Sequence, residues 1–295
     1  MVKLSGPATV PFNIKAALEQ LIAQKFPADF SAGFCLSPVA GLSGESWKIE
    51  TRTRTWLARI QSPARTALGV ERQREKAILQ HIVHLNIAPR VMLYSPPWLV
   101  VEWLEGQTCE EYPIEIVPLA ERLVQLHQAG PHGRQLQLKQ QFSLHWQQID
   151  RRRLSPGWLR LQHRFMRQSL PVPLKMAVIH MDVHPGNLII GEQGLQLIDW
   201  EYAADGDIAL ELATLFRGNG WLVGQQQRFL AGYCAAGGYR DITGLQRQIC
   251  RWLPWVDYMM LMWFEVRWNQ TGDKTYLDWA QPLRERLFAT VRTSK

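Results

Sequence analysis

Long apolar runs and closely spaced cysteines are both missing from this sequence. No apolar run reaches the ~20 residues that a membrane-spanning helix requires, and residues 1–10 lack the continuous apolar segment of a secretory signal peptide. We therefore expect a cytoplasmic protein that has no membrane partner. The four cysteines form no CxxC pair, which argues against a zinc site or a disulfide framework and favours reduced, packed thiols (Cys35, Cys109, Cys234 and Cys250).

Internal repeats and low-complexity linkers are missing too. What is present is an ordinary globular composition, with 46% hydrophobic and 20% charged residues in a chain of 295 residues. Such a chain buries a sizeable core, either as one large domain or as two of ordinary size. Its formal net charge of +7 allows an anionic partner and does not choose between a nucleotide and a nucleic acid.

The charges are unevenly distributed along the chain. Residues 151–175 contain seven Lys or Arg and no acid, whereas residues 199–211 contain five acids and no base. The basic stretch is interpreted most simply as a solvated helix face. The acidic stretch calls for a nearby cation, because its carboxylates otherwise repel one another.

The hydrophobic pattern changes near residue 106. Before this point, alternation and apolar runs predict several strands, and after it helical periodicity prevails. We therefore predict an α+β protein of two lobes, a β-rich N-lobe (1–105) and a mostly helical C-lobe (106–295). The predicted strands are 34–39, 46–51, 55–60, 98–103, 177–179 and 195–199, and the predicted helices are 14–25, 71–85, 117–128, 144–153, 158–168, 208–216, 225–236 and 244–269, with a kink at Pro254.

One strand–loop–strand segment carries the polar groups that phosphoryl transfer needs. The strand at 177–179 leads into a loop with Asp182 and, five positions later, Asn187, and the next strand ends at Asp199. An H-x-D…N loop followed by a strand-end Asp is a kinase signature. One carboxylate orients the attacking hydroxyl and accepts its proton, while oxygen ligands hold Mg²⁺ against the phosphates of ATP.

We therefore predict Asp182 as the catalytic base, with Asn187 and Asp199 as the Mg²⁺ ligands. His180 completes the catalytic set by bracing the loop through hydrogen bonds, and His184 either braces the loop or packs. The alternative is an Asx-rich turn capped by Asp182. An ordered set of five polar residues rarely arises in such a turn by accident.

The phosphates of ATP have candidate contacts in the N-lobe. Gly41 and Gly44 lie in a hairpin turn whose backbone N–H groups can approach phosphates closely, although any hairpin may contain two glycines. Arg59, on the third strand, stands where a protein kinase carries its phosphate-binding lysine, and its planar guanidinium suits phosphate. Glu75 is the candidate ion-pair partner of Arg59, and Glu71 is a competing choice.

The adenine base also has a candidate site. The run from Val100 to Leu104 offers backbone groups to the base edge and apolar side chains to its faces, so we predict nucleotide contacts at Glu102 and Leu104. A central buried strand is the structural interpretation of the same run. The two interpretations are compatible.

Two sequence motifs resemble those of a known protein family. Residues 180–187 and 198–201 resemble the motifs of the aminoglycoside phosphotransferase and choline kinase superfamily. Further motifs at 197–203, 205–213 and 263–268 resemble those of the bacterial members that phosphorylate thiamine. The resemblance implies a two-lobed protein-kinase-like fold, with a small antiparallel-sheet N-lobe and a larger helical C-lobe. It also implies ATP and Mg²⁺ as cofactors and transfer of phosphate to the hydroxyl of thiamine, giving thiamine monophosphate in a salvage pathway.

The acceptor site is predicted near the C-terminal end. Thiamine carries a thiazolium cation and a flat pyrimidine, which suit aromatic faces and carboxylates. Trp263 and Glu265 are therefore the candidate acceptor contacts, although a Trp-rich helix also serves as core. Asp207 and Glu211 are predicted to stabilise the loop and helix behind the site.

Other functions fit parts of the sequence. Choline, an aminoglycoside or a sugar needs the same catalytic residues, so the motif alone does not select the acceptor. A nucleic-acid-binding protein would use the basic residues 151–175 and would show strongly salt-dependent affinity. We expect no nucleic-acid partner, and the intact base and metal ligands argue against a pseudokinase.

Overall fold

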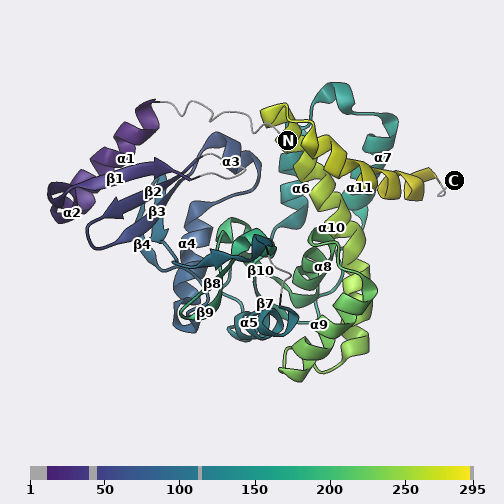
Figure 1. The fold of residues 1–295 in the computed structure, drawn as a ribbon. Helices are drawn as coiled ribbons and strands as arrows, with labels where there is room; N and C mark the ends of the chain where they lie inside the picture. Colours follow the sequence, from purple (N-terminus) through teal and green to yellow (C-terminus); the bar gives the residue numbers. More distant parts are fainter. Residues whose placement is uncertain (1–11, 40–44, 112–114, 293–295) are drawn as a thin grey trace. The chain divides into compact units, whose positions relative to one another are not determined.

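The computed structural model describes residues 12–39, 45–111 and 115–292 (Figure 1). The chain separates into two compact units, which are described here one at a time. The smaller unit comprises Met1–Gln61 and Pro89–Glu105, and the larger unit comprises Ser62–Ala88 and Gly106–Lys295. The predicted lobe boundary at 105/106 stays a prediction. The compact units group Ser62–Ala88 with the larger unit.

The smaller unit is a five-stranded antiparallel sheet with two helices. The hydrophobic alternation along its strands places Trp47, Ile49 and Trp56 in one core, where they meet Leu18 and Ile22 from the first helix. The elements are α1 (Phe12–Lys25), α2 (Pro27–Ala32), β1 (Phe34–Pro38), β2 (Ser46–Thr51), β3 (Thr55–Ile60), β4 (Val91–Ser95) and β5 (Trp98–Glu102), with strand order β1-β2-β3-β5-β4.

The larger unit is mostly helical and carries two small antiparallel sheets. One sheet pairs β7 with β10, and the other has the order β6-β8-β9. Its elements are α3 (Pro63–Ala67), α4 (Arg72–His81), β6 (Gln107–Thr108), α5 (Ile116–Gln128), α6 (Leu138–Gln148), α7 (Pro156–Arg167), β7 (Met176–Ile179), β8 (Leu188–Gly191), β9 (Gly194–Leu197), β10 (Ala204–Asp207), α8 (Ile208–Gly218), α9 (Val223–Ala235), α10 (Ile242–Thr271) and α11 (Thr275–Arg292), with short 3₁₀ turns η1 (Val83–Leu85), η2 (Cys109–Glu111), η3 (Arg151–Arg153), η4 (Pro185–Asn187) and η5 (Trp200–Tyr202).

Gly106, the first residue of the second segment of the larger unit, has no room for a side chain. Its φ is +149°, and a Cβ built there would lie 2.5 Å from the carbonyl oxygen of Ile190. Only glycine meets both conditions without strain. This close approach lets β6 pair with β8, the strand that follows the Asp182–Asn187 loop.

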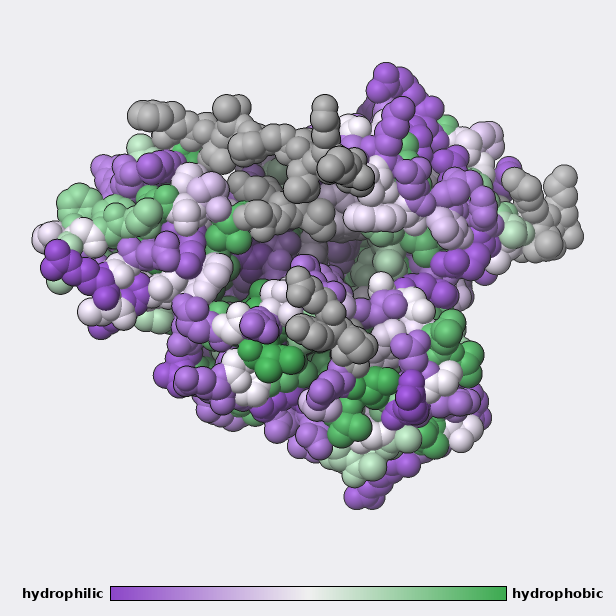
Figure 2. Space-filling model, in the orientation of Figure 1, coloured by the Kyte–Doolittle hydropathy of each residue, from purple (hydrophilic) through white to green (hydrophobic). Residues whose placement is uncertain are grey.

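The predicted α+β class is confirmed, with differences at several elements. The predicted helix 144–153 is α6 followed by the separate turn η3. The strands β4, β6, β8 and β10 and the helices α2, α3 and α11 were not predicted. Helix α10 contains Pro254, as expected. Among the described helices, none combines the length and the apolar character that crossing a bilayer requires. On the face drawn in Figure 2, hydrophilic side chains outnumber hydrophobic ones.

Candidate active site

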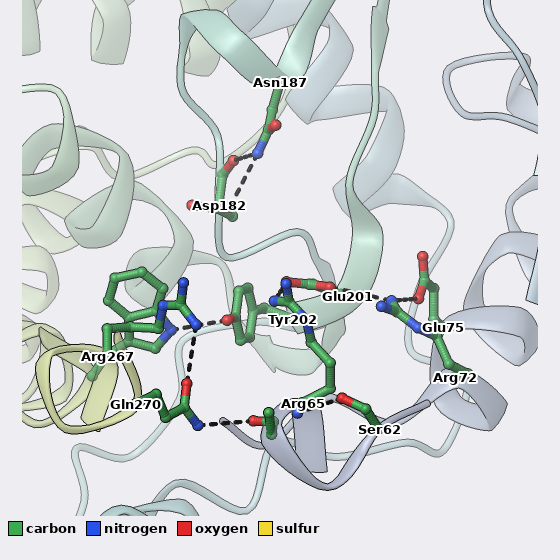
Figure 3. A network of polar contacts seen from close by, with 12 residues as sticks. Ser62, Arg65, Arg72, Glu75, Asp182, Asn187, Glu201, Tyr202, Arg267 and Gln270 are labelled. Carbon is green, nitrogen blue, oxygen red and sulfur yellow. Dashed lines mark hydrogen bonds and ion pairs between the residues drawn. The ribbon is translucent and has the colours of Figure 1, made fainter. Parts of the chain in front are cut away.

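The loop between β7 and β8 brings Asp182 and Asn187 together. The Asn187 amide nitrogen donates to the Asp182 carbonyl at 2.9 Å and to the Asp182 carboxylate Oδ2 at 3.0 Å. Figure 3 shows the two side chains facing each other across the loop. Because the nitrogen of Asn187 is directed at Asp182, its oxygen remains as an acceptor for another group.

The loop is fixed by a buried carboxylate on α8. Glu211 is fully buried, and its two oxygens accept the backbone N–H groups of His180 and Met181, the second at 2.9 Å. Met181 has φ +71°, a conformation that costs a non-glycine residue energy unless its surroundings hold it. The His180 ring contacts the Ile198 carbonyl at 2.9 Å and accepts from the Asp182 N–H at 3.2 Å. His180 therefore braces the loop through these contacts, and its place in the catalytic set stays a prediction.

Further groups stabilise the segment behind the loop. His127 lies 3.9 Å from Glu211, and burial, which alone would raise the pKa of Glu211, is outweighed by His127 and His180, which lower it. Asp205 accepts three backbone N–H groups from residues 132–134. Asp207 caps α8 and accepts from the indole of Trp252 at 2.8 Å. The predicted supporting roles of Asp207 and Glu211 are confirmed.

Asp199 stands at the end of β9 in an unusual backbone conformation. Its φ and ψ are +62° and +62°, the left-handed region that Asp and Asn tolerate better than most residues. The next residue, Trp200, is fully buried, and its indole N–H donates to the Leu197 carbonyl at 2.8 Å. Its ring packs edge-on against His180 at 4.6 Å between centroids. Asp199 is thereby tied to the same loop as Asp182.

Negative charge is concentrated around Asp182. Burial, with the charges of Asp199 and Glu201, raises the pKa of Asp182 to about 8. The Asp182 side chain is nevertheless 38% exposed, so one edge remains open to an acceptor or a cation. His184 accepts the Gly186 N–H through Nδ1 and lies 3.8 Å from Asp182. His184 thus braces its own turn, and burial lowers its pKa.

The donor set fits Mg²⁺. Asn187, Asp199 and Asp182 offer oxygen, the ligand atom that Mg²⁺ prefers, and the crowded carboxylates would be relieved by a cation. Within the described residues, no group of three or more His, Cys, Asp and Glu side chains is placed to hold a metal ion. Mg²⁺ that arrives with a nucleotide keeps several waters and needs few protein groups. The binding of Mg²⁺ by Asn187 and Asp199 stays a prediction.

Comparison with known proteins decides the family. The model of the phosphotransferase enzyme family matches residues 36–247. The chain belongs to this family. Thiamine kinases from Escherichia coli O157:H7 and Shigella flexneri are each 38% identical to it over 238 residues, which cover 81% of this chain and 84% of each relative.

Solved structures share the fold of this family member. Choline kinase LicA from Streptococcus pneumoniae has a TM-score of 0.75 at 18% identity, covering 94% of this chain and 99% of that chain. A ternary complex of the aminoglycoside phosphotransferase APH(4)-Ia with ADP and hygromycin B has a TM-score of 0.61 at 15% identity, covering 92% and 98%. The predicted protein-kinase-like fold is thereby confirmed.

In this phosphotransferase, all predicted nucleotide contacts except Glu75 belong to the smaller unit. Arg59 lies buried on β3 and pairs in register with Leu99 on β5. Glu102 ends β5 and accepts the Arg90 N–H at 3.3 Å, and Leu104 follows it. Gly41 and Gly44 lie outside the described residues. The nucleotide contacts of all these residues stay predictions.

Glu75 has a partner within the larger unit. It is buried on α4, and its carboxylate lies 2.6 Å from the guanidinium of Arg72. The proposed pairing of Glu75, or of Glu71, with Arg59 stays a prediction. Sequence reasoning missed the role of Arg72, since a charge three positions before a glutamate on a helix normally signals only a surface pair.

The phosphotransferase's predicted acceptor residues lie on α10. Trp263 is half-buried, and its indole N–H donates to the Tyr202 hydroxyl at 2.8 Å. Glu265 is fully buried, and its two oxygens accept from Arg153 at 2.6 and 2.9 Å. The Arg153 guanidinium also stacks 4.7 Å above the Trp268 ring. Glu265 therefore already has a cation, and its direct contact with an acceptor stays a prediction.

Tyr202 joins the predicted acceptor residue Trp263 to the turn that follows Asp199, a contact that sequence reasoning missed. It follows Glu201 in η5 and packs with Trp263 against the small core of Leu68, Val70 and Val266. Burial and the charges of Glu201 and Asp182 raise its pKa. The sequence feature that could have indicated this contact is the position of Tyr202, directly after the Asp199-Trp200-Glu201 motif.

Proposed function

We propose that this phosphotransferase is an ATP-dependent thiamine kinase, which transfers the γ-phosphoryl group of ATP to the hydroxyl of thiamine. The observation that carries the proposal is the Asp182–Asn187 pair with Asp199, in a chain that is 38% identical to thiamine kinases over 81% of its length. Since ATP is the phosphate donor, we assign the reaction to the cytoplasm.

Each catalytic group has a defined task in this proposal. The exposed edge of the Asp182 carboxylate orients the acceptor hydroxyl and accepts its proton as the oxygen attacks the γ-phosphorus. Deprotonation of Asp182 is required first, and a cation beside it lowers its raised pKa and favours the carboxylate. Asn187 and Asp199 would hold Mg²⁺. The metal would neutralise the charge that develops on the phosphate oxygens.

The acceptor cation requires negative charge and aromatic surface. Tyr202 and Trp263 supply neighbouring aromatic rings that are joined by a hydrogen bond, and Tyr202 lies near the Asp182 charge. A thiazolium ring is attracted to such faces. We propose that Trp263 contacts thiamine directly and that Glu265 acts through Arg153.

Two arginines of the basic stretch 151–175 are engaged in ion pairs within the chain. Arg153 is paired with the buried Glu265, and the exposed Arg152 is paired with Asp150 at 2.7 Å. Arg160 and Arg164 lie on the exposed side of α7, whose other side carries the buried Trp158. This is the pattern of a solvated amphipathic helix.

The test is a panel of acceptors with the purified protein. ATP consumption is measured with Mg²⁺ and thiamine, choline, hygromycin B or glucose, and thiamine monophosphate is identified by mass spectrometry. We expect turnover with thiamine to exceed that with every other acceptor. Turnover confined to choline, hygromycin B or glucose would reassign the acceptor, and absence of ATP turnover with all four would refute the proposed activity.

A further inference from the structure

The Glu201 carboxylate is held by two arginines from a distant part of the chain. Its Oε1 lies 3.3 Å from the Arg65 guanidinium, and its Oε2 lies 3.2 Å from the Arg72 guanidinium. Arg65, Arg72 and Glu201 are each at most 5% exposed. Figure 3 shows the two arginines approaching Glu201 from the α3–α4 segment. We call Arg65, Arg72 and Glu201 the arginine clamp.

The clamp is continued on both sides by further contacts. Arg72 also pairs with Glu75, and Arg74 donates to the main-chain carbonyls of Gly69 at 2.9 Å and Glu201 at 3.4 Å. On α10, Gln270 donates to the Ala64 carbonyl at 3.1 Å. The short helix α3 is therefore fixed to both the η5 turn and α10.

The position of Glu201 makes this arrangement relevant to Asp199. The two residues that follow Asp199 are both immobilised, Trp200 by its burial and its hydrogen bond to Leu197, and Glu201 by the clamp. Asp199 itself has the left-handed backbone conformation, which a neighbouring structure must hold. With both following side chains fixed, the backbone from which the Asp199 side chain projects is fixed too.

Energetics favour a positioning role over a purely stabilising one. A buried ion pair is a weak source of stability, because desolvation of the charges offsets most of their attraction. Apolar side chains of similar volume would fill the same space at lower cost. A buried set of charges next to a proposed metal ligand is better explained by the geometry that it imposes on that ligand.

We propose that the arginine clamp is the positioning device for Asp199 and thereby sets the affinity of the enzyme for its metal–nucleotide complex. This inference rests on the proposed function, in which Asp199 is a metal ligand. Arg65, Arg72 and Glu201 act through the backbone of η5 and touch neither substrate nor metal. The clamp also makes α3 and α4, which precede the catalytic loop by about a hundred residues, part of the active site's support.

Glu201→Gln tests the clamp because it keeps the side-chain shape and removes the charge. Mn²⁺ serves as the probe, and its binding to the full-length protein with saturating ADP is measured by electron paramagnetic resonance. We expect the Mn²⁺ dissociation constant to rise by about 10- to 100-fold, the usual effect of disturbing the support of a metal ligand. In turnover, kcat should fall at fixed Mg²⁺ and recover with excess Mg²⁺, while KM for thiamine changes little.

Asp257→Asn is the matched control. Asp257 is another buried carboxylate in the larger unit, and it pairs with Arg217 at 2.6 Å and with Arg286 at 3.4 Å, between α10, α8 and α11. The Asp257→Asn variant should lose thermal stability, as Glu201→Gln does, but should keep the wild-type affinity for Mn²⁺. Wild-type affinity in Glu201→Gln, or equal weakening in Asp257→Asn, would overturn the inference, since the clamp would then be only structural.

Arg65→Lys gives a second, milder variant in case Glu201→Gln does not fold. It retains the positive charge and removes the fork that reaches Glu201, so its Mn²⁺ affinity should lie between those of wild type and Glu201→Gln. A folded Arg65→Lys protein with wild-type affinity and wild-type Mg²⁺ dependence contradicts the clamp. Failure of the proposed function looks different: the wild type would bind Mn²⁺ with ADP yet leave thiamine unphosphorylated. Absence of Mn²⁺ binding by the wild type would overturn the inference itself.

Discussion

The catalytic segment, residues 180–211, and the helix α10 are organised in different ways. In the catalytic segment, the loop around Asp182 is held by groups of the same segment: Asn187 donates to Asp182, and Glu211 accepts from the backbone of His180 and Met181. On α10, Glu265 is held by Arg153, which lies 112 positions earlier in the chain. The catalytic loop is therefore held from within its own segment, whereas Glu265 in the predicted acceptor region, like Glu201 in η5, depends on arginines that lie far away in the chain.

This difference separates two consequences of mutation. Groups that are held locally and exposed in part, such as Asp182, can lose their chemistry without loss of the fold. Groups that are held by distant buried partners, such as Glu265, lose stability when the partner is removed. The predictions below test this separation, beginning with the largest effect.

Asp182→Asn should give the largest effect, a fall in kcat of about 100- to 10,000-fold, because the amide cannot accept the proton of the acceptor hydroxyl. Steady-state kinetics with ATP and thiamine measure the fall, and circular dichroism checks the fold. Asp278→Asn, at an exposed position on α11, serves as the control with unchanged turnover. Wild-type turnover in Asp182→Asn would remove Asp182 as the base.

Arg153→Met should destabilise the protein by about 3–5 kcal/mol, since it leaves the fully buried Glu265 carboxylate without a cation. Glu265→Gln should cost less, because the Arg153 side chain is 23% exposed and can reach water. Urea denaturation of both variants and of the double variant measures the asymmetry.

The double variant should lose less than the sum of the two single losses. A different pattern would indicate that Glu265 on α10 takes part directly in acceptor binding. If Glu265→Gln keeps its stability and raises KM for thiamine at constant kcat, Glu265 contacts the acceptor, as the sequence first suggested.

The catalytic segment could be predicted from the sequence because its information is local. The spacing of Asp182, Asn187 and Asp199 is a kinase signature, and the flanking strands at 177–179 and 195–199 correspond to β7 and β9. The strand β10 escaped prediction because its four residues, Ala204–Asp207, lack the alternation of a strand, although all four are buried. Helix α11 contains Pro282, which interrupts its helical pattern.

The partners of the charged residues could not be predicted in the same way. Arg65 and Glu201 are 136 positions apart, and neither residue carries a local sign of the other. Arg153 looked like one member of a solvated basic stretch, while its pairing with Glu265 depends on where η3 meets α10. Single-sequence reasoning predicted the groups proposed for the chemistry and the supporting roles of Asp207 and Glu211, and it missed the arginines that hold Glu201 and Glu265.

Two buried histidines, one in the catalytic loop and one on a helix beside α10, lower the stability of the fold as the pH falls. His180 belongs to the catalytic loop, whereas His145 lies fully buried on α6, which packs beside α10. Burial lowers the pKa of His145 to about 4 from its usual 6.5, against a smaller opposing effect of the Leu68 backbone. Between these values the unfolded chain binds a proton that the folded chain does not, so stability falls as the pH falls.

His145→Leu should remove this loss, which amounts to about 2 kcal/mol between pH 7 and pH 5. Denaturant unfolding at the two pH values measures it for both proteins, and the wild type should show the steeper decline. Burial lowers the pKa of His180 as well. Some decline of the free energy of unfolding with falling pH is therefore expected in both the wild type and His145→Leu. If the free energy of unfolding declines equally with falling pH in the wild type and in His145→Leu, His145 is not a buried neutral base.

Trp263→Phe should give the smallest effect and bears most directly on the acceptor. It keeps an aromatic face and removes the indole N–H that donates to Tyr202 at 2.8 Å. Loss of one such hydrogen bond is worth about 0.5–1.5 kcal/mol, so KM for thiamine should rise by about 2- to 12-fold at nearly constant kcat. Trp279→Phe, whose ring is 49% exposed on α11, is the matched control and should leave KM unchanged. If the two variants behave alike, Trp263 is core packing, and the acceptor site must be sought elsewhere around Asp182.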